Sequence, residues 1–230
     1  MAEISRVEGT LQEGIKLYQL KRWEPALAVL LGLDTEDFSP EDNAELAYYL
    51  GLCYTKLKRY DDALLYLEQV ITFGQNPLRT YQCRMTLAYI YVITKRSRMA
   101  EFELKRLTSS GFESAQIYTT LAYAAWAQKQ FKQAVDYYER ALDLDGSNAT
   151  ALNGLGYVLV DEDMDPIRGL RCCKKAVDLR PNNPAYLDSL GWAYFKNGDY
   201  LEARTWLRRA LDAAPQEKEI RDHFKTVVGG

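Results

Sequence analysis

The chain of 230 residues contains a single histidine, four cysteines and no long apolar run. With His223 as the only imidazole, the sequence offers little support for a Ser-His-Asp or Cys-His catalytic arrangement. The cysteines, Cys53, Cys83, Cys172 and Cys173, lack the Cys-x-x-Cys spacing of a zinc site, so we predict neither metal binding nor redox chemistry. These absences argue against an enzyme and against a cofactor.

The chain also lacks a glycine-rich phosphate loop, since neither Gly-x-x-x-x-Gly-Lys nor Gly-x-Gly-x-x-Gly occurs. No stretch of about 20 uncharged apolar residues could cross a bilayer, and the first residues have no apolar run typical of a signal peptide. Free thiols, expected for all four cysteines, suit a reducing compartment. We therefore expect a soluble, cytoplasmic protein without membrane insertion, or a periplasmic or membrane-anchored one if a leader has been removed.

A basic excess is missing as well. The chain has 29 Lys and Arg against 32 Asp and Glu, a net charge of -3. A surface that follows a phosphate backbone usually needs a basic excess on one face. Basic clusters such as residues 95–98 are expected on the outer side of the fold, where they keep the protein soluble. We predict no nucleic-acid partner, and nucleic-acid binding ranks third among the hypotheses.

The chain does contain one short pattern that returns six times. A small residue recurs at intervals of 37, 37, 34, 34 and 35 residues, and a second small residue follows each one after 12 or 13 positions. The first set is Gly14, Gly51, Ala88, Ala122, Gly156 and Gly191, and the second is Ala26, Ala63, Ala100, Ala134, Gly169 and Ala203. This period is typical of a solenoid, and apolar residues at helical spacing around each small residue predict two helices per repeat. Small side chains let the two helices cross at about 8–10 Å.

The sixth repeat carries the clearest family pattern, with Leu187, Leu190, Gly191, Tyr194, Ala203, Leu207, Ala210 and Pro215. This pattern resembles the tetratricopeptide repeat family, and the resemblance extends over about residues 7 to 217. It implies an all-α, right-handed superhelical solenoid of about six helix-turn-helix repeats, in one domain over residues 1–230. The repeats are expected at about 7–43, 44–80, 81–114, 115–148, 149–183 and 184–217, with a capping helix at about 216–228.

Local signals explain the departures from a uniform spacing. The two intervals of 37 residues contain the helix-start signals Ser39-Pro40 and Asn76-Pro77, so we expect lengthened first helices in the second and third repeats. The extra residue of the fifth repeat falls in the acidic stretch 161–166, between its two helices. Because this stretch lacks the glycine and the distal glutamate of a calcium loop, we predict a solvated turn there.

Function is expected on the concave surface that stacked repeats create, lined mainly by the first helix of each repeat. In the resembling family, ligands usually lie in this groove. The inward positions here are mostly aromatic or neutral, and our predicted partner-binding residues are Tyr48, Leu52, Met85, Tyr89, Thr119, Tyr123, Trp126, Asn153, Tyr157, Asp188, Trp192 and Phe195. For Trp126 and Phe195 a core position is an equal alternative. We predict a non-catalytic interaction module or adaptor that binds a peptide, an extended segment or an amphipathic helix.

One subgroup of the resembling family can be tested by residue type. Tetratricopeptide domains that hold the C-terminal carboxylate of cytosolic chaperones use Lys, Asn and Arg at inward positions of successive repeats. The corresponding positions here are Leu11, Ile15, Tyr49, Gln82 and Thr86, and shifting the register by one repeat finds no clamp either. We therefore do not expect chaperone tails as ligands.

The C-terminal part points to an origin and to an alternative function. Residues 184–194 and 219–223 are similar to the closing repeats of bacterial tetratricopeptide proteins, which commonly assist assembly of envelope or secretion machinery. Residues 216–228 place Ile220, Phe224 and one of Val227 and Val228 on one helical face, suited to capping the last repeat. If this helix is instead half of a seventh repeat, its exposed end favours a homo-oligomer, and the protein is a self-associating scaffold for a bacterial assembly.

Overall fold

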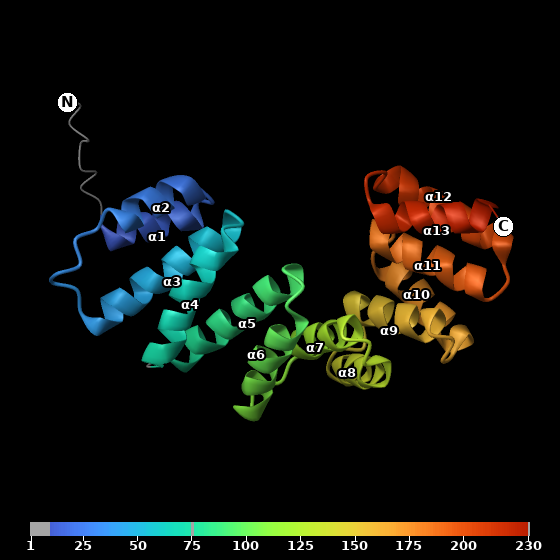
Figure 1. Ribbon diagram of the computed structural model, residues 1–230, viewed down its shortest axis with the longest axis horizontal. Coiled ribbons are helices and arrows are strands. Elements are labelled where there is room, and N and C mark those ends of the chain that lie inside the picture. Colours follow the sequence, from blue (N-terminus) through green and yellow to red (C-terminus); the bar gives the residue numbers. More distant parts are fainter. Residues whose placement is uncertain (1–9, 75, 230) are drawn as a thin grey trace. The chain divides into compact units, whose positions relative to one another are not determined.

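The computed structural model of the chain describes residues 10–74 and 76–229. Over these residues the structure consists of thirteen α-helices and their connections, which confirms the predicted all-α class (Figure 1). The described residues fall into two compact units, which end and begin at Leu107 and Thr108. Whether the two units form the single domain predicted over residues 1–230 does not follow from their internal packing, so the single domain stays a prediction. No helix in the described part of the chain has both the length and the apolar character to span a membrane.

Unit 1 contains three pairs of helices. Its helices are α1 (Leu11–Gln19), α2 (Trp23–Leu31), α3 (Pro40–Lys56), α4 (Tyr60–Phe73), α5 (Pro77–Ile93) and α6 (Ser97–Ser109), of which α6 runs past the end of the unit. Helix α1 packs on α2, and α3 packs on α4. An ion pair between Arg84 and Glu103 joins α5 to α6. Helix α3 also contacts α1 and α5, so the first helices of successive repeats lie against one another.

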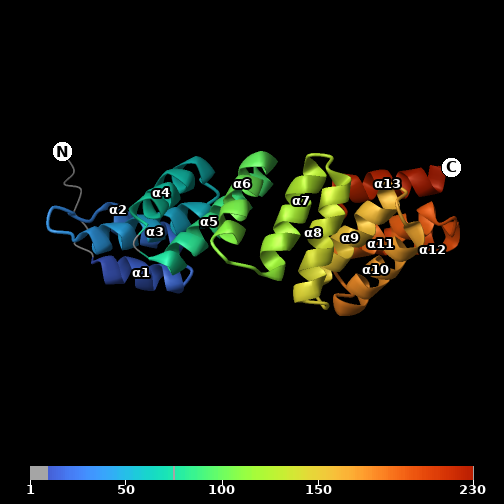
Figure 2. The ribbon, with the colours of Figure 1, turned by 90° about the horizontal axis from the view of Figure 1, so that it is seen from below.

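Unit 2 contains three further pairs and a final helix. Its helices are α7 (Ala115–Ala127), α8 (Phe131–Leu144), α9 (Ala149–Asp161), α10 (Pro166–Leu179), α11 (Pro184–Lys196), α12 (Tyr200–Ala213) and α13 (Lys218–Gly229). Each first helix packs on its partner, as α7 and α8 show in Figure 2, and α7, α9, α11 and α13 also contact one another in that order (Figure 1). The predicted repeat pairs and closing helix are thereby confirmed, with Ile220 and Val227 of α13 buried.

The predicted lengthening of two first helices is confirmed. Helices α3 and α5 have 17 residues each, whereas α7, α9 and α11 have 13. Ser39 and Asp42 form a reciprocal capping box at the start of α3. The Asn76 side chain accepts hydrogen bonds from the backbone N–H groups of Leu78 and Arg79. These side chains satisfy backbone N–H groups that the start of a helix leaves unpaired. The additional turn of α3 and of α5 therefore begins directly after Ser39 and Asn76.

A residue with left-handed backbone conformation lies two positions after the end of the first helix of every repeat, seven positions after the small residue. These residues are Lys21, Lys58, Lys95, Lys129, Asp163 and Gly198, with φ between 52° and 85°. In the fifth repeat this residue lies within the acidic stretch, and Asp165 caps α10 by accepting a hydrogen bond of 2.9 Å from the N–H of Arg168. The exposed Asp163 and its neighbours therefore make the solvated turn that the sequence predicts.

The fifth repeat departs from the others at its helix crossing, where two glycines meet. A Cβ atom on Gly156 of α9 would lie 2.9 Å from the carbonyl oxygen of Gly169 on α10, and a Cβ on Gly169 would lie 2.8 Å from that of Gly156. Neither backbone can yield independently, because each belongs to a helix packed on further neighbours. Glycine at both positions therefore allows the closest approach between α9 and α10.

We predict that Gly156→Ala lowers the free energy of unfolding by about 1–3 kcal/mol, the usual cost of overpacking a core. Gly146→Ala is the control, because its Cβ would meet only a carbonyl oxygen at 3.6 Å. Urea unfolding followed by circular dichroism measures both variants. Equal stability of the two variants would contradict the proposed tight crossing.

Candidate partner-binding site

The first helices of unit 2 bring a series of rings together. We call this series the aromatic row, and it comprises Tyr123, Trp126, Tyr157, His223, Trp192 and Phe195. Successive ring centroids lie between 4.2 and 6.4 Å apart, within or close to the usual range for interacting aromatic pairs. Trp192 and His223 are the closest pair, stacked at 4.2 Å with an interplanar angle of 16°. Four helices thus contribute to one continuous surface of rings.

The repeat geometry explains why these rings share one surface. Tyr123, Tyr157 and Trp192 each follow the small residue of their repeat, which faces the partner helix. Because successive residues of an α-helix point about 100° apart, the residue after the small one is directed away from that crossing. The same position in three stacked helices therefore gives three neighbouring rings.

The aromatic row is only partly covered by the protein. Tyr123 is 42% exposed, and Trp126, Tyr157, Trp192 and Phe195 are half-buried. Each ring therefore combines packing within the unit with area that a ligand can cover. Trp126 and Phe195, for which the sequence left core and contact positions open, are neither fully buried nor exposed, and their contact with a partner stays a prediction.

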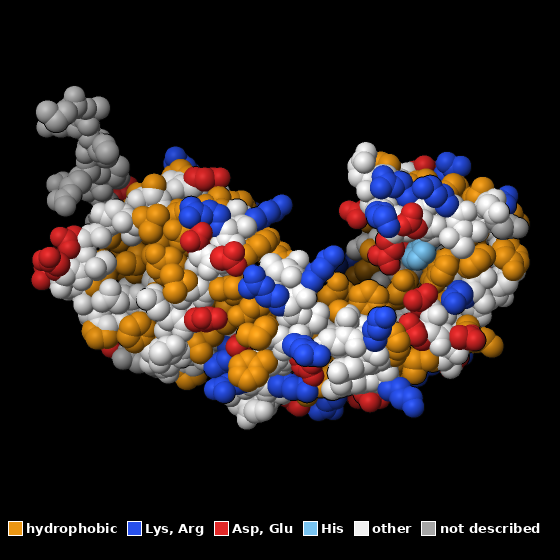
Figure 3. All heavy atoms as spheres, in the orientation of Figure 1, with side chains coloured by type: hydrophobic (Ala, Val, Ile, Leu, Met, Phe, Trp, Pro, Cys, Tyr) orange, Lys and Arg blue, Asp and Glu red, His pale blue; other side chains and the backbone are white. Residues whose placement is uncertain are grey.

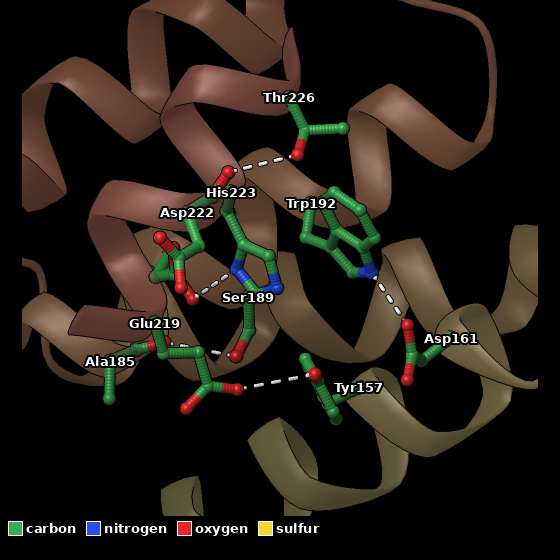
Figure 4. Close-up of polar contacts among 10 residues, drawn as sticks. Tyr157, Asp161, Ala185, Ser189, Trp192, Glu219, Asp222, His223 and Thr226 are labelled. Atoms are coloured by element: carbon green, nitrogen blue, oxygen red, sulfur yellow. Dashed lines mark hydrogen bonds and ion pairs between the residues drawn. The ribbon is translucent and has the colours of Figure 1, made fainter.

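Polar partners fix the orientation of three rings. The indole N–H of Trp192 donates a hydrogen bond of 2.9 Å to Asp161, at the end of α9 (Figure 4). The hydroxyl of Tyr157 donates to Glu219 of α13 at 3.3 Å. Nδ1 of His223 lies 2.9 Å from Oδ2 of Asp188 on α11. Rings that are already held in place lose less conformational entropy when a ligand binds.

Acidic side chains contact several rings of this surface. Figure 3 shows the one histidine, in pale blue, at the surface of unit 2 with acidic and hydrophobic side chains beside it. Burial raises the pKa of the Tyr157 hydroxyl, and the charges of Asp161, Glu219 and Asp188 raise it further. The phenol therefore stays protonated and remains a hydrogen-bond donor at neutral pH.

His223 is subject to opposing effects. Burial alone would lower the pKa of its imidazole, but the hydrogen bond to Asp188 and the negative charges of Asp188, Glu219 and Asp161 raise it above its ordinary value. The imidazolium is thus stabilised where α13 meets α11, and protonation strengthens that junction.

A pocket of about 240 Å³ opens beside the aromatic row. Its walls include Tyr123 and Trp126 of α7, Asn153 and Tyr157 of α9, Asp188 of α11 and Glu219 of α13. Gly154 also lines it, and a side chain at that position would run into the ring of Tyr138. The pocket therefore combines aromatic faces with amide and carboxylate groups.

The predicted site residues of unit 2 meet in part at this pocket. Tyr123, Trp126, Asn153, Tyr157 and Asp188 line it, whereas Trp192 and Phe195 continue the aromatic row beyond it. Asp188 is only 5% exposed.

Thr119 is also half-buried, and its hydroxyl donates to the carbonyl oxygen of Ala115, within α7. It does not belong to the residues that line the pocket.

The predicted site residues of unit 1 differ in their environment. Tyr48 is 7% exposed, because the Arg79 guanidinium lies 4.0 Å from its ring centroid and its hydroxyl donates to Gln82. Leu52 and Met85 are half-buried, and Tyr89 is 53% exposed. Tyr89 therefore offers surface directly, while Tyr48 supports its neighbours. Partner binding by the full set of twelve residues stays a prediction.

Sequence reasoning missed three groups of this site: Asp161, Glu219 and His223. Glu219 and His223 lie on α13, which the sequence describes mainly as a cap. The alternative interpretation of residues 216–228 as the first half of a seventh repeat could have pointed to Glu219 and His223, because first helices are expected to line the groove. Asp161 was assigned to the acidic turn, although its carboxylate reaches the Trp192 indole.

Comparisons with known proteins agree with this architecture. Sequence profiles described as "Tetratricopeptide repeat" match residues 11–77, 119–162 and 184–217, together more than half of the chain. The TPR repeat-containing protein PA4667 of Pseudomonas aeruginosa is 39% identical over 77 residues, which cover 34% of this chain and 13% of that protein. The chain thus spans only a small part of that relative's length.

Solved structures show the same fold at low sequence identity. The APC/C hetero-tetramer Cut9-Hcn1 matches with a TM-score of 0.74 and 15% identity, covering 95% of this chain and 42% of that chain. The structure described as "YrrB: a TPR protein with an unusual peptide-binding site" matches with a TM-score of 0.59 and 15% identity, covering 94% of this chain and all of that chain.

The junction between α11 and α13 makes stability depend on pH. Because folding raises the pKa of His223, its protonation favours the folded state. This contribution is fully present below the ordinary pKa of about 6.5 and is lost as the pH rises through the higher folded-state value. We predict that, as the pH rises above about 6.5, the free energy of unfolding falls more steeply for the native chain than for His223→Gln. Urea unfolding at a series of pH values measures this, and parallel curves would contradict the assignment.

Proposed function

The chain belongs to the tetratricopeptide repeat family, and from that premise we propose that it is a non-catalytic interaction module whose unit 2 binds a segment of a partner protein along the aromatic row. The observation that carries the proposal is the continuous contact of rings from Tyr123 to Phe195, partly exposed and held by polar partners. Tyrosine and tryptophan are the side chains that most often anchor protein interfaces. An extended peptide or one face of an amphipathic helix can cover such a row.

The charge of this surface supports a protein partner over a nucleic acid. Asp161, Asp188 and Glu219 would repel a phosphate backbone. On α12, Arg208 lies over the ring of Phe224 and Arg209 over that of Trp206, so these two cations already pack on aromatic side chains. The YrrB structure, described as having a peptide-binding site, provides a precedent within the same fold.

Self-association through the C-terminal end is the second candidate function. Leu201 and Tyr200, at the start of α12, are 76% and 60% exposed, and Val228 near the end of α13 is 49% exposed. Isolated apolar side chains of this kind are common on protein surfaces, so they favour this candidate less than the continuous row favours partner binding. A monomeric mass by light scattering at high concentration would count against a self-associating scaffold.

We predict that short peptides selected from a phage-displayed random library on the full chain bind along the aromatic row. Tyr123→Ala should weaken their binding by about 2 kcal/mol, roughly 30-fold in Kd, because an exposed anchor ring is removed. Isothermal titration calorimetry measures the affinity, and circular dichroism confirms that the variant remains folded. Leu179→Ala, which removes an apolar side chain of 47% exposure from α10, is the matched control and should leave Kd unchanged.

Two results would overturn the proposal. Failure of any peptide to be enriched on the native chain would argue against a peptide-binding module. Selected peptides that bind Tyr123→Ala as tightly as the native chain would place binding elsewhere.

A further inference from the structure

Two buried oxygens at the pocket beside the aromatic row have no hydrogen-bond donor among the described residues: Oδ1 of Asn153 and Oδ1 of Asp188. Both residues line the pocket, one from α9 and the other from α11. Each lies one helical turn before a ring of the aromatic row, since Tyr157 follows Asn153 and Trp192 follows Asp188 by four residues. Acceptors and rings therefore occupy neighbouring positions on the same helix faces.

The unpaired oxygen of Asp188 is unusual for a group so deeply buried. The residue is only 5% exposed, and its other oxygen, Oδ2, is engaged by His223. A buried acceptor without a donor costs about 1–3 kcal/mol, and native structures contain few such groups. Two of them beside one pocket are open acceptors to which a ligand could donate.

The charges around the pocket define the sign of that ligand. Glu219 lines the pocket together with Asp188, and Asp161 lies beside the row. Two cationic side chains near the aromatic row are His223, bound to Asp188, and Lys196, whose ammonium lies 5.9 Å from the Trp192 ring centroid and which does not line the pocket. An anion would be repelled by the carboxylates of Asp188 and Glu219. A cation with several N–H donors could instead donate hydrogen bonds to Oδ1 of both Asn153 and Asp188.

The pocket walls favour a flat cation over a compact one. Tyr123, Trp126 and Tyr157 contribute rings to the lining. A guanidinium stacks on aromatic faces, is weakly hydrated and donates several hydrogen bonds in one plane, whereas an ammonium is a strongly hydrated point charge. The pocket volume of about 240 Å³ far exceeds the space of one water molecule, which needs about 10–15 Å³. Among the described residues, no group of three or more His, Cys, Asp or Glu side chains could instead hold a metal ion.

We propose that this pocket binds the guanidinium group of an arginine in the partner segment, with its plane against the aromatic wall and its N–H groups donating to Asn153 and Asp188. The assignment rests on the proposed function, because it names the side chain by which the partner is recognised. Glu219 adds charge at the α13 side of the pocket while it holds the Tyr157 hydroxyl. Specificity then comes from arginine, and the rest of the aromatic row supplies contact area.

The test compares two capped tripeptides, Ac-Gly-Arg-Gly-NH2 and its citrulline analogue, by NMR titration of the labelled full chain. Citrulline keeps the planar shape of the arginine side chain but carries no charge. We expect the arginine peptide to bind about tenfold more tightly, because it makes charge-assisted hydrogen bonds. Equal affinities, or absence of binding by the arginine peptide, would overturn the proposal.

Protein variants test the same contact from the other side. Asp188→Asn should weaken the arginine peptide about tenfold, and Glu219→Gln, which keeps the acceptor for Tyr157, roughly threefold. Asp178→Asn removes the same charge from an exposed position on α10 and should leave the affinity unchanged. Since Asp188→Asn also alters the contact with His223, its thermal stability is measured in parallel, and Glu219→Gln provides the second test. Unchanged affinity in both pocket variants would overturn the guanidinium assignment.

The outcome is distinguishable from failure of the proposed function. If library-selected peptides lose binding in Tyr123→Ala while arginine and citrulline bind equally, the aromatic row remains the binding surface and the arginine pocket is wrong. If no selected peptide depends on the row, the proposed function itself fails.

Discussion

The close crossing of two helices in each repeat is the constraint on which the aromatic row depends. At Gly191, as at Gly156, an added Cβ would come within 3 Å of backbone atoms of the partner helix, so the two helices are held in one register. That register fixes the direction of the next residue, Trp192 or Tyr157. Because the same crossing recurs in neighbouring helix pairs, the residues that follow the small residues lie next to one another and form a row of rings.

Helix α13 completes this surface as well as covering the end of the last pair. Ile220 and Val227 provide the apolar cover, while Glu219 and His223 reach Tyr157 and Asp188 on two earlier first helices. One short helix therefore serves packing and site geometry together. The carboxylates at this mainly aromatic surface come from three helices: Asp161 from α9, Asp188 from α11 and Glu219 from α13.

Local features of this fold follow from local sequence. Helix pairs, the lengthened α3 and α5 and the turn after α9 could be predicted, because small residues, caps such as Ser39 and Asn76, and turn residues act over a few positions. The environments of individual groove residues could not. Tyr48 is covered by Arg79, 31 residues later, and Trp192 is bonded to Asp161, 31 residues earlier.

The same argument applies to the pocket beside the aromatic row. Asn153 and Asp188 were predicted as polar contact residues from their columns, but the lack of donors for their oxygens emerges only from the packed helices. His223 illustrates the difference most clearly. From the sequence, His223 stands out only as the single histidine, which offers little support for a catalytic arrangement, whereas its position between Trp192, Tyr157 and Asp188 depends on how α13 docks.

The four tryptophans allow the most direct measurement. Trp126 and Trp192 belong to the aromatic row, whereas Trp23 lies in unit 1 and the indole N–H of Trp206 is bonded to Glu202 on α12. In a nitrogen-15 NMR titration of the full chain with a library-selected peptide, the account predicts shifts of the Trp126 and Trp192 indole signals and stationary Trp23 and Trp206 signals. Movement of Trp23 or Trp206 with Trp126 and Trp192 unchanged would contradict it.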